Sequence, residues 1–206
     1  MKKIFAVIIN TIIILFGIAG VIMQIIEAGT FAFQYYTNLS NVIGTFASLF
    51  FVIAIIIPKK WIVNTTKILK LISVTSLAVT FITVAIILAP MDKEHGYFYY
   101  FFHGSMFNYH LAIPVLSFVT FAFFERYDYK YINALMYNMI FTLTYGILMI
   151  ILSNTGVVKA PYSFLDFINS PIWFNVICFV VILGIDALIT FILLILEKNN
   201  KAEILW

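Results

Sequence analysis

Six stretches of about twenty residues carry almost no charged side chain, and this pattern constrains the fold more than any other feature of the sequence. A helix needs roughly 20 apolar residues to cross the hydrocarbon core of a bilayer, and runs of that length are typical of transmembrane helices. The sequence therefore predicts an all-α polytopic membrane protein in which residues 1–206 form one bundle of six transmembrane helices. The predicted spans are Ile4–Ile26, Thr37–Ile57, Ile68–Leu88, Asn108–Phe124, Ile132–Leu152 and Ile172–Leu196.

The composition places the chain in the same class. Of its 206 residues, 64% are hydrophobic and 10% are charged, whereas soluble domains carry about 25% charged residues. The short loops leave no room for a separate soluble domain. No basic run indicates nucleic-acid binding. The single cysteine, Cys178, excludes an internal disulfide.

The basic residues predict the orientation of the bundle. Ten of the twelve lysine and arginine side chains fall on one side, and only Lys93 and Lys159 fall on the other. Because basic loops stay in the cytoplasm, both termini are predicted to face the cytoplasm. Lysine outnumbers arginine eleven to one, which indicates an AT-rich, bacterial coding sequence and hence a bacterial plasma membrane. The ten residues are Lys2, Lys3, Lys59, Lys60, Lys67, Lys70, Arg126, Lys130, Lys198 and Lys201.

Polar residues inside the spans are the candidate functional residues, because each is costly to remove from water. The second span opens with Tyr35-Tyr36-Thr37-Asn38-Leu39-Ser40-Asn41, and helical spacing puts Thr37, Ser40 and Asn41 on one face. In a structural interpretation, Thr37 or Asn38 caps the helix and the later polar residues bond neighbouring helices. In a functional interpretation, the Thr37 hydroxyl lies beside free backbone N–H groups that stabilise an oxyanion.

The fourth span contains His110 four residues before Pro114. Because proline has no N–H, the carbonyl of His110 loses its helical partner and the helix should bend there. An imidazole on such an opened turn can act as a base near neutral pH, or it can donate to a neighbouring carbonyl. Asp166 is the only acid of the loop before the last span. It either supports His110 or is a solvated turn residue.

The sixth span carries Asp186 near the middle of the predicted bilayer. A carboxyl group there must be paired or protonated. Its candidate partners are Asn138, Thr142 and Tyr145, which share one face of the fifth span. Asp186 is a candidate proton carrier, cation ligand or hydrogen-bonded tie between helices.

The first span has a face of small and amide side chains. Asn10, Gly17 and Gln24 recur at intervals of seven, with Gly20 beside them. Small residues permit close approach of helices and amides bridge them. This face therefore predicts a helix–helix contact.

Three short segments together resemble a known family. They are Tyr35–Asn41, Tyr109-His110 with Pro114, and Pro161-Tyr162-Ser163-Phe164-Leu165-Asp166. Their order and helix placement resemble those of bacterial multipass proteins related to the androgen-inducible membrane hydrolases, over most of the chain. The resemblance implies that a threonine and a histidine embedded in the membrane split esters of hydroxylated fatty acids. The nucleophile would be Thr37 and the base His110.

The leading hypothesis is therefore an intramembrane lipid-ester hydrolase with its site near the outer leaflet. Thr37 attacks the ester, His110 takes its proton, and Ser40 or Asn41 helps to stabilise the oxyanion. Asp166 and Asp186 are supporting residues. The alternatives are a small proton-coupled transporter that uses Asp186 and a non-catalytic assembly subunit.

We expect no cofactor. We expect no metal either, since the histidine spacings match no zinc pattern. The expected partners are the lipid bilayer and a fatty-acid-ester substrate, and the oligomeric state stays open.

Overall fold

The computed structural model describes residues 2–199, and of Met91 the backbone alone. These residues form helices and no strand. Five helices are long and apolar enough to cross a bilayer, the third of them continued by the π-helical turn η2 (Val84–Leu88). The all-α class is confirmed, and the helix set is that of a polytopic membrane protein. The five are α1 (Lys2–Ala28), α2 (Tyr36–Ile56), α3 (Lys60–Thr83), α7 (Tyr131–Asn154) and α8 (Ile172–Asn199).

The fourth predicted span is part of a broken pair of helices. The short helix α5 (Gly96–Phe102) meets the unit formed by η3 (Phe107–Ala112) and α6 (Ile113–Phe123) at 86°. Gly104 lies in the break with a positive φ of 50°, a conformation that glycine adopts without steric cost. The described residues thus contain six candidate spans if this pair is one span and five otherwise. The 3-10 turns η1 (Thr30–Gln34) and η4 (Ser163–Leu165) and the short helix α4 (Ala89–Met91) complete the chain.

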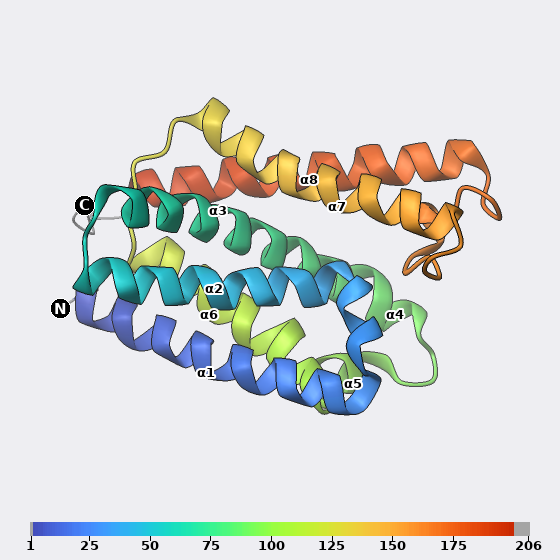
Figure 1. Cartoon of the computed structure of the whole chain (residues 1–206), viewed down its shortest axis with the longest axis horizontal. Coiled ribbons are helices and arrows are strands. Elements are labelled where there is room, and N and C mark those ends of the chain that lie inside the picture. Colours follow the sequence, from blue (N-terminus) through green and yellow to red (C-terminus); the bar gives the residue numbers. More distant parts are fainter. Residues whose placement is uncertain (1, 200–206) are drawn as a thin grey trace.

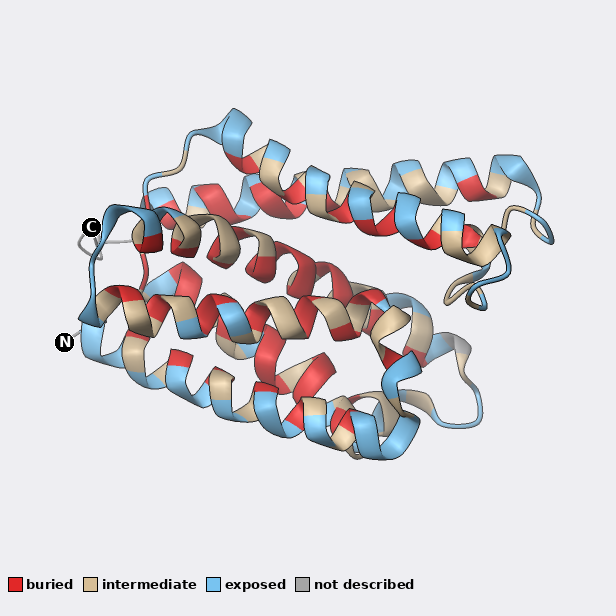
Figure 2. Cartoon of the chain, viewed as in Figure 1, coloured by how far each residue is buried: buried red, intermediate tan, exposed pale blue. Residues whose placement is uncertain are grey.

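Helix α3 is the centre of the arrangement. Helices α2 and α6 pack on one side of it, with α1 against both of them, and the α7–α8 hairpin packs on the other side (Figure 1). Among the long helices, α3 has the largest buried share. Exposed residues follow the outward faces of the surrounding helices (Figure 2). Large apolar side chains dominate those faces, as expected of surfaces that contact lipid.

The predicted small-residue face of α1 is confirmed, and it contacts other helices of the same chain. Asn10, Gly17, Gly20 and Gln24 are all buried. A Cβ atom on Gly17 would lie 1.9 Å from Thr45 Oγ1 on α2, and one on Gly20 would lie 2.5 Å from the Tyr109 ring. Only glycine allows these approaches.

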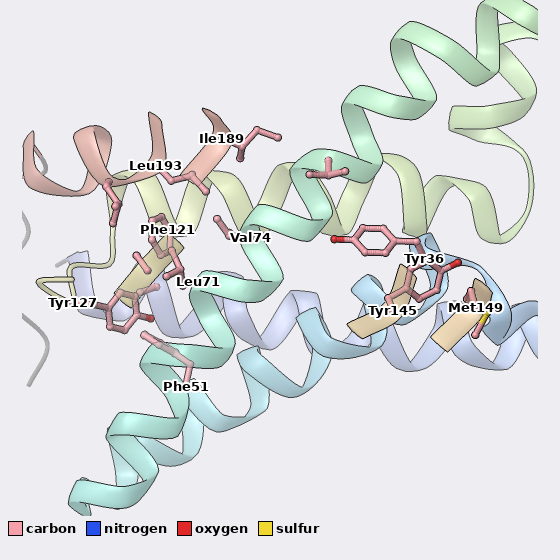
Figure 3. Close-up of a cluster of buried hydrophobic side chains, with 14 of the residues drawn as sticks. Tyr36, Phe51, Leu71, Val74, Phe121, Tyr127, Tyr145, Met149, Ile189 and Leu193 are labelled. Atoms are coloured by element: carbon pink, nitrogen blue, oxygen red, sulfur yellow. The ribbon is translucent and has the colours of Figure 1, made fainter. Parts of the chain in front are cut away.

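The main apolar core runs along α3 between two aromatic ends (Figure 3). Phe51 and Tyr127 lie at one end, and Tyr36 and Tyr145 lie at the other. Each end borders a distinct group of polar side chains. These two groups differ in how completely their polar atoms are paired.

Candidate functional site

A buried charged network joins α1, α3 and α6 at the Phe51 end of the core. Lys70 Nζ lies 3.0 Å from Glu125 Oε1 and donates to Asn10 Oδ1 at 2.9 Å. Asn10 Nδ2 donates to Glu125 Oε1 at 2.7 Å, and the Thr120 hydroxyl donates to the same oxygen at 2.9 Å. The Tyr127 hydroxyl donates to Glu125 Oε2. We call these five residues the Lys70 network.

The Lys70 network has a structural role, because its charged groups are buried and already bonded to one another. Lys70 is 1% exposed and Glu125 is 0% exposed, and both oxygens of the carboxylate are hydrogen-bonded. Charges that are paired and hydrogen-bonded in this way pin helices together. Lys70 is therefore not a loop residue, and the positive-inside comparison becomes nine basic residues against two. In the sequence, the feature that indicates this network is Lys70, a charged residue two positions inside the predicted span Ile68–Leu88.

A cavity of about 610 Å³ lies at the Tyr36 end of the core, between the α7–α8 hairpin and helices α2 and α3. The loop before α8 covers it through Pro161–Leu165. Most of its wall is apolar, contributed by η2 and α8. The rest of the lining, which we call the hydroxyl-rich wall, includes eight residues that carry a hydroxyl group: Tyr36, Thr37, Thr80, Thr83, Thr142, Tyr145, Tyr162 and Ser163.

Thr37 lies on the hydroxyl-rich wall of the cavity, half-buried in the first turn of α2. Its side chain interacts with the Tyr162 phenol, which also lines the cavity. Burial raises the pKa of Tyr162 to about 12, against the opposing effect of its hydrogen bonding to Thr37. The Tyr162 phenol is therefore protonated at neutral pH. Its oxygen accepts from Thr37 and from the backbone of Tyr36 and Thr37, and its own hydrogen is available to a ligand. Sequence reasoning gave this tyrosine no role, although it belongs to the segment that carried the resemblance.

The helix start differs from the predicted one. The N-cap position of α2 is Tyr35, whose carbonyl accepts the N–H groups of Asn38 and Leu39, so neither Thr37 nor Asn38 is the cap. Ser40 Oγ donates to the carbonyl of Thr37 at 2.8 Å. That bond directs the Ser40 hydroxyl to the backbone of Thr37 and away from its side chain. The structure thus does not place Ser40 as an oxyanion donor.

Pro114 reshapes the backbone around His110 through a π-helical turn. The N–H of Ile113 donates to the carbonyl of Asn108, one residue further back than in an α-helix, and Pro114 has no N–H. The carbonyl of Tyr109 therefore has no partner in its own helix. Asn41 Nδ2 donates to it at 3.0 Å. The sequence predicted this orphaned acceptor one residue later, at His110.

The same Asn41 amide links the two candidate catalytic segments. Asn41 Nδ2 also donates to the carbonyl of Thr37 at 2.8 Å, so the backbones of Thr37 and Tyr109 lie on either side of one side-chain amide. The amide nitrogen therefore donates hydrogen bonds to two backbone carbonyls. Its oxygen, Asn41 Oδ1, is buried and has no hydrogen-bond partner. Asn41 thus connects the segments of Thr37 and His110 and leaves one acceptor unused.

His110 is buried at 6% exposure beside the Thr37 segment. Its Nδ1 donates to the carbonyl of Tyr100 at 2.7 Å, the bond foreseen in the structural interpretation. This bond fixes the Nδ1–H tautomer of the neutral ring and leaves the lone pair on Nε2. Within residues 2–199, no hydrogen bond joins the His110 ring to the Thr37 hydroxyl, and His110 is not part of the cavity wall.

Asp166 is a turn residue and is not joined to His110. Its carboxylate accepts from the N–H groups of Ile168 and Asn169 and from the Asn169 side chain. The Asn169 bonds lower the pKa of Asp166. Of the two interpretations of Asp166, the structure supports the solvated turn residue.

Asp186 is buried at 1% exposure on α8, directly behind the cavity wall. Thr142, one of its predicted partners, donates to Asp186 Oδ2 at 2.8 Å. The Tyr36 hydroxyl lies 3.1 Å from Thr142 Oγ1, and both residues line the cavity. The other two predicted partners bond elsewhere: Asn138 to Thr75 and Thr190, and Tyr145 to the carbonyl of Gln34.

Histidine, cysteine and acidic side chains do not gather as metal ligands anywhere in residues 2–199. Comparison of the chain with protein-family models gave no match, and searches against curated proteins and solved structures gave none either.

Proposed function

We propose that the chain is an intramembrane hydrolase of lipid esters, with its site in the cavity beside Thr37. The observation that carries the proposal is the position of Thr37 and Tyr162 on the hydroxyl-rich wall of an otherwise apolar cavity. An apolar pocket with a few convergent polar groups is the usual form of a small-molecule site. The ester group would lie against the hydroxyls and its acyl chain along η2 and α8.

The cavity wall reaches the lipid-facing surface of the bundle. Ile87 of η2 and Val181 of α8 both line the cavity, and they are 46% and 52% exposed. A lipid would thus enter sideways from the bilayer without crossing water. This access favours a membrane lipid as the substrate over a polar metabolite.

The reaction uses Thr37 as the nucleophile and His110 as the base. His110 Nε2 takes the hydroxyl proton while Thr37 Oγ1 attacks the ester carbonyl. The protonated Tyr162 phenol donates to the oxyanion, a role first considered for Ser40 and Asn41. The leaving alcohol takes the proton from His110, and water then releases the acyl group from Thr37. The step requires the His110 ring to come within hydrogen-bonding distance of Thr37 when substrate is bound.

The proposal includes an orientation in a bacterial plasma membrane. The end that carries the Lys70 network would face the cytoplasm, because nine basic residues flank it against two at the other end. One of the nine, Lys201, lies outside the described residues. The cavity mouth then opens toward the outer leaflet.

The two alternative functions have less support. A transporter needs a polar path from Asp186 to both surfaces, whereas the carboxyl group of Asp186 has a single neutral partner, Thr142. An assembly subunit would use the glycine face of α1, but Thr45 and Tyr109 of the same chain occupy that face.

The test is hydrolysis of a fatty-acid ester by the purified protein in lipid nanodiscs. Thr37→Ala and His110→Ala should each abolish hydrolysis, and Thr37→Ser should keep part of it. Thr83→Ala removes another cavity hydroxyl and serves as the matched control that stays active. Full activity in both Thr37→Ala and His110→Ala would refute the proposal.

A further inference from the structure

Asp186 is a buried acid that no cation among residues 2–199 neutralises. The ion pairs described in the structure do not include it. The lysine furthest into α3, Lys70, is held by Glu125, and α6 carries no titratable side chain. The titratable groups that line the cavity are the phenols of Tyr36, Tyr145 and Tyr162 and the thiol of Cys178. None of them supplies a positive charge at neutral pH.

Two hydroxyl groups connect Asp186 to the cavity, and each has a single hydrogen to donate. If the carboxyl group is ionised, Thr142 donates to it at 2.8 Å. Tyr36 must then donate to Thr142 across 3.1 Å, and it presents only lone pairs to the cavity. If the carboxyl group is protonated on Oδ2, it donates to Thr142 and both bonds reverse. Tyr36 then accepts from Thr142 and has its own hydrogen free for a ligand.

We infer that Asp186 determines, through Thr142, whether the Tyr36 phenol donates or accepts a hydrogen bond in the cavity. The protonated form needs no counter-ion, so it is the form suited to a buried acid without a cation. In that form Tyr36 selects a ligand with a carbonyl oxygen, such as the ester or acid group of a lipid. The ligand class rests on the proposed function. The relay from Asp186 rests on the two hydrogen bonds.

The relay is tested by ligand binding, so that a failure of catalysis does not affect the result. Cys178 is the only cysteine of the chain and lines the same cavity. Its rate of reaction with a maleimide therefore reports whether the cavity is occupied. The two ligands are a long-chain methyl ketone, which cannot be hydrolysed, and the terminal alkene of the same length. The protein should prefer the ketone by about three- to tenfold, the effect of one net hydrogen bond.

Four measurements decide the relay. Tyr36→Phe should lose the preference for the ketone. In the unmodified protein, the preference for the ketone should fall as the pH rises. The infrared carbonyl band of protonated Asp186 should fall over the same pH range. That band is assigned by its loss in Asp186→Asn. Asp186→Asn keeps a donor to Thr142 and should retain the preference at every pH. Thr142→Val frees the Tyr36 hydrogen, so the preference should persist without pH dependence.

If the bond between Asp186 and Thr142 only stabilises the fold, the four measurements should give other results. The inference is overturned if Tyr36→Phe keeps the preference, or if the preference and the carbonyl band change independently of each other. It is also overturned if Asp186→Asn remains pH-dependent, or if the unmodified protein shows no protonated carboxyl band at all. An ester that binds with the predicted preference but is never hydrolysed would refute the proposed function and leave the relay intact.

Discussion

The Lys70 network and the cavity both bury polar side chains within the helix bundle, and they differ in how the cost of burial is met. In the network, the carboxylate of Glu125 accepts from Lys70, Asn10, Thr120 and Tyr127, and every charge has a partner. At the cavity, Asp186 forms no ion pair with any residue of the described part of the chain. Complete pairing indicates a structural role, whereas polar groups that remain available beside an open volume indicate a functional one.

The largest expected effect comes from replacing a buried carboxyl group by an amide, and the two regions should respond differently. Glu125→Gln leaves Lys70 buried without a counter-charge and should lower the free energy of unfolding by about 3–5 kcal/mol. Asp186→Asn replaces an acid that has no cation by a neutral group of the same shape, and it should cost less than about 1 kcal/mol. Thermal unfolding in one detergent measures both.

Two controls sharpen this test of the acids. Glu94 is exposed on a loop, so Glu94→Gln should leave unfolding unchanged. Replacing Lys70 and Glu125 together by apolar side chains should recover most of the stability lost in Glu125→Gln. Equal losses in Glu125→Gln and Asp186→Asn would remove the distinction between the two regions.

The next effect concerns packing in the closed part of the bundle. Gly17→Ala puts a methyl group 1.9 Å from Thr45 Oγ1 and should cost about 1–3 kcal/mol through overpacking. Gly184 on α8 has nothing within 4 Å of a built Cβ. Gly184→Ala should therefore be neutral or stabilise by up to about 1 kcal/mol. The unfolding temperatures of the two variants measure this difference. A larger loss of stability in Gly184→Ala than in Gly17→Ala would contradict the described packing.

The smallest effect concerns the loop that covers the cavity. The pKa of Asp166 is lowered by its bonds from Asn169 and from backbone N–H groups. Its stabilising effect is therefore present above the unfolded pKa of about 3.9 and is lost as pH falls through the lower folded value. Protease cleavage within residues 161–170 should increase only under acid conditions. In Asp166→Asn the cleavage rate should not vary with pH in this range, and a pH dependence equal to that of the unmodified chain would reject this role.

The helices were predictable because length and hydropathy determine them. Each of the six predicted spans has a helical counterpart, and the bounds of α2, for example, differ by one residue from the prediction Thr37–Ile57. The sharp bend before α6 was not predicted, because it depends on the conformation of Gly104. Pro114 did predict a disturbed turn, and only the neighbouring carbonyl was assigned incorrectly.

The site was predictable in part. Thr37, and Thr142 as the partner of Asp186, followed from polarity and helical spacing. The partners of Lys70 did not, because hydropathy does not reveal that α1, α3 and α6 meet at Glu125. The neighbourhood of Tyr162 depends on the path of a loop, which has no periodic signal in the sequence. The expected pairing of Thr37 with His110 is not formed in this structure and remains a prediction for the substrate-bound state.

We propose that the hydroxyl of Thr37 is a reactive group in a lipid-accessible cavity. The most direct measurement is mass-spectrometric mapping of the residue that an alkyl fluorophosphonate labels in the purified protein in nanodiscs. We expect a single adduct on Thr37 that disappears in His110→Ala and persists in Thr83→Ala. An adduct on another hydroxyl of the cavity, or no adduct in protein that still hydrolyses a fatty-acid ester, would contradict it.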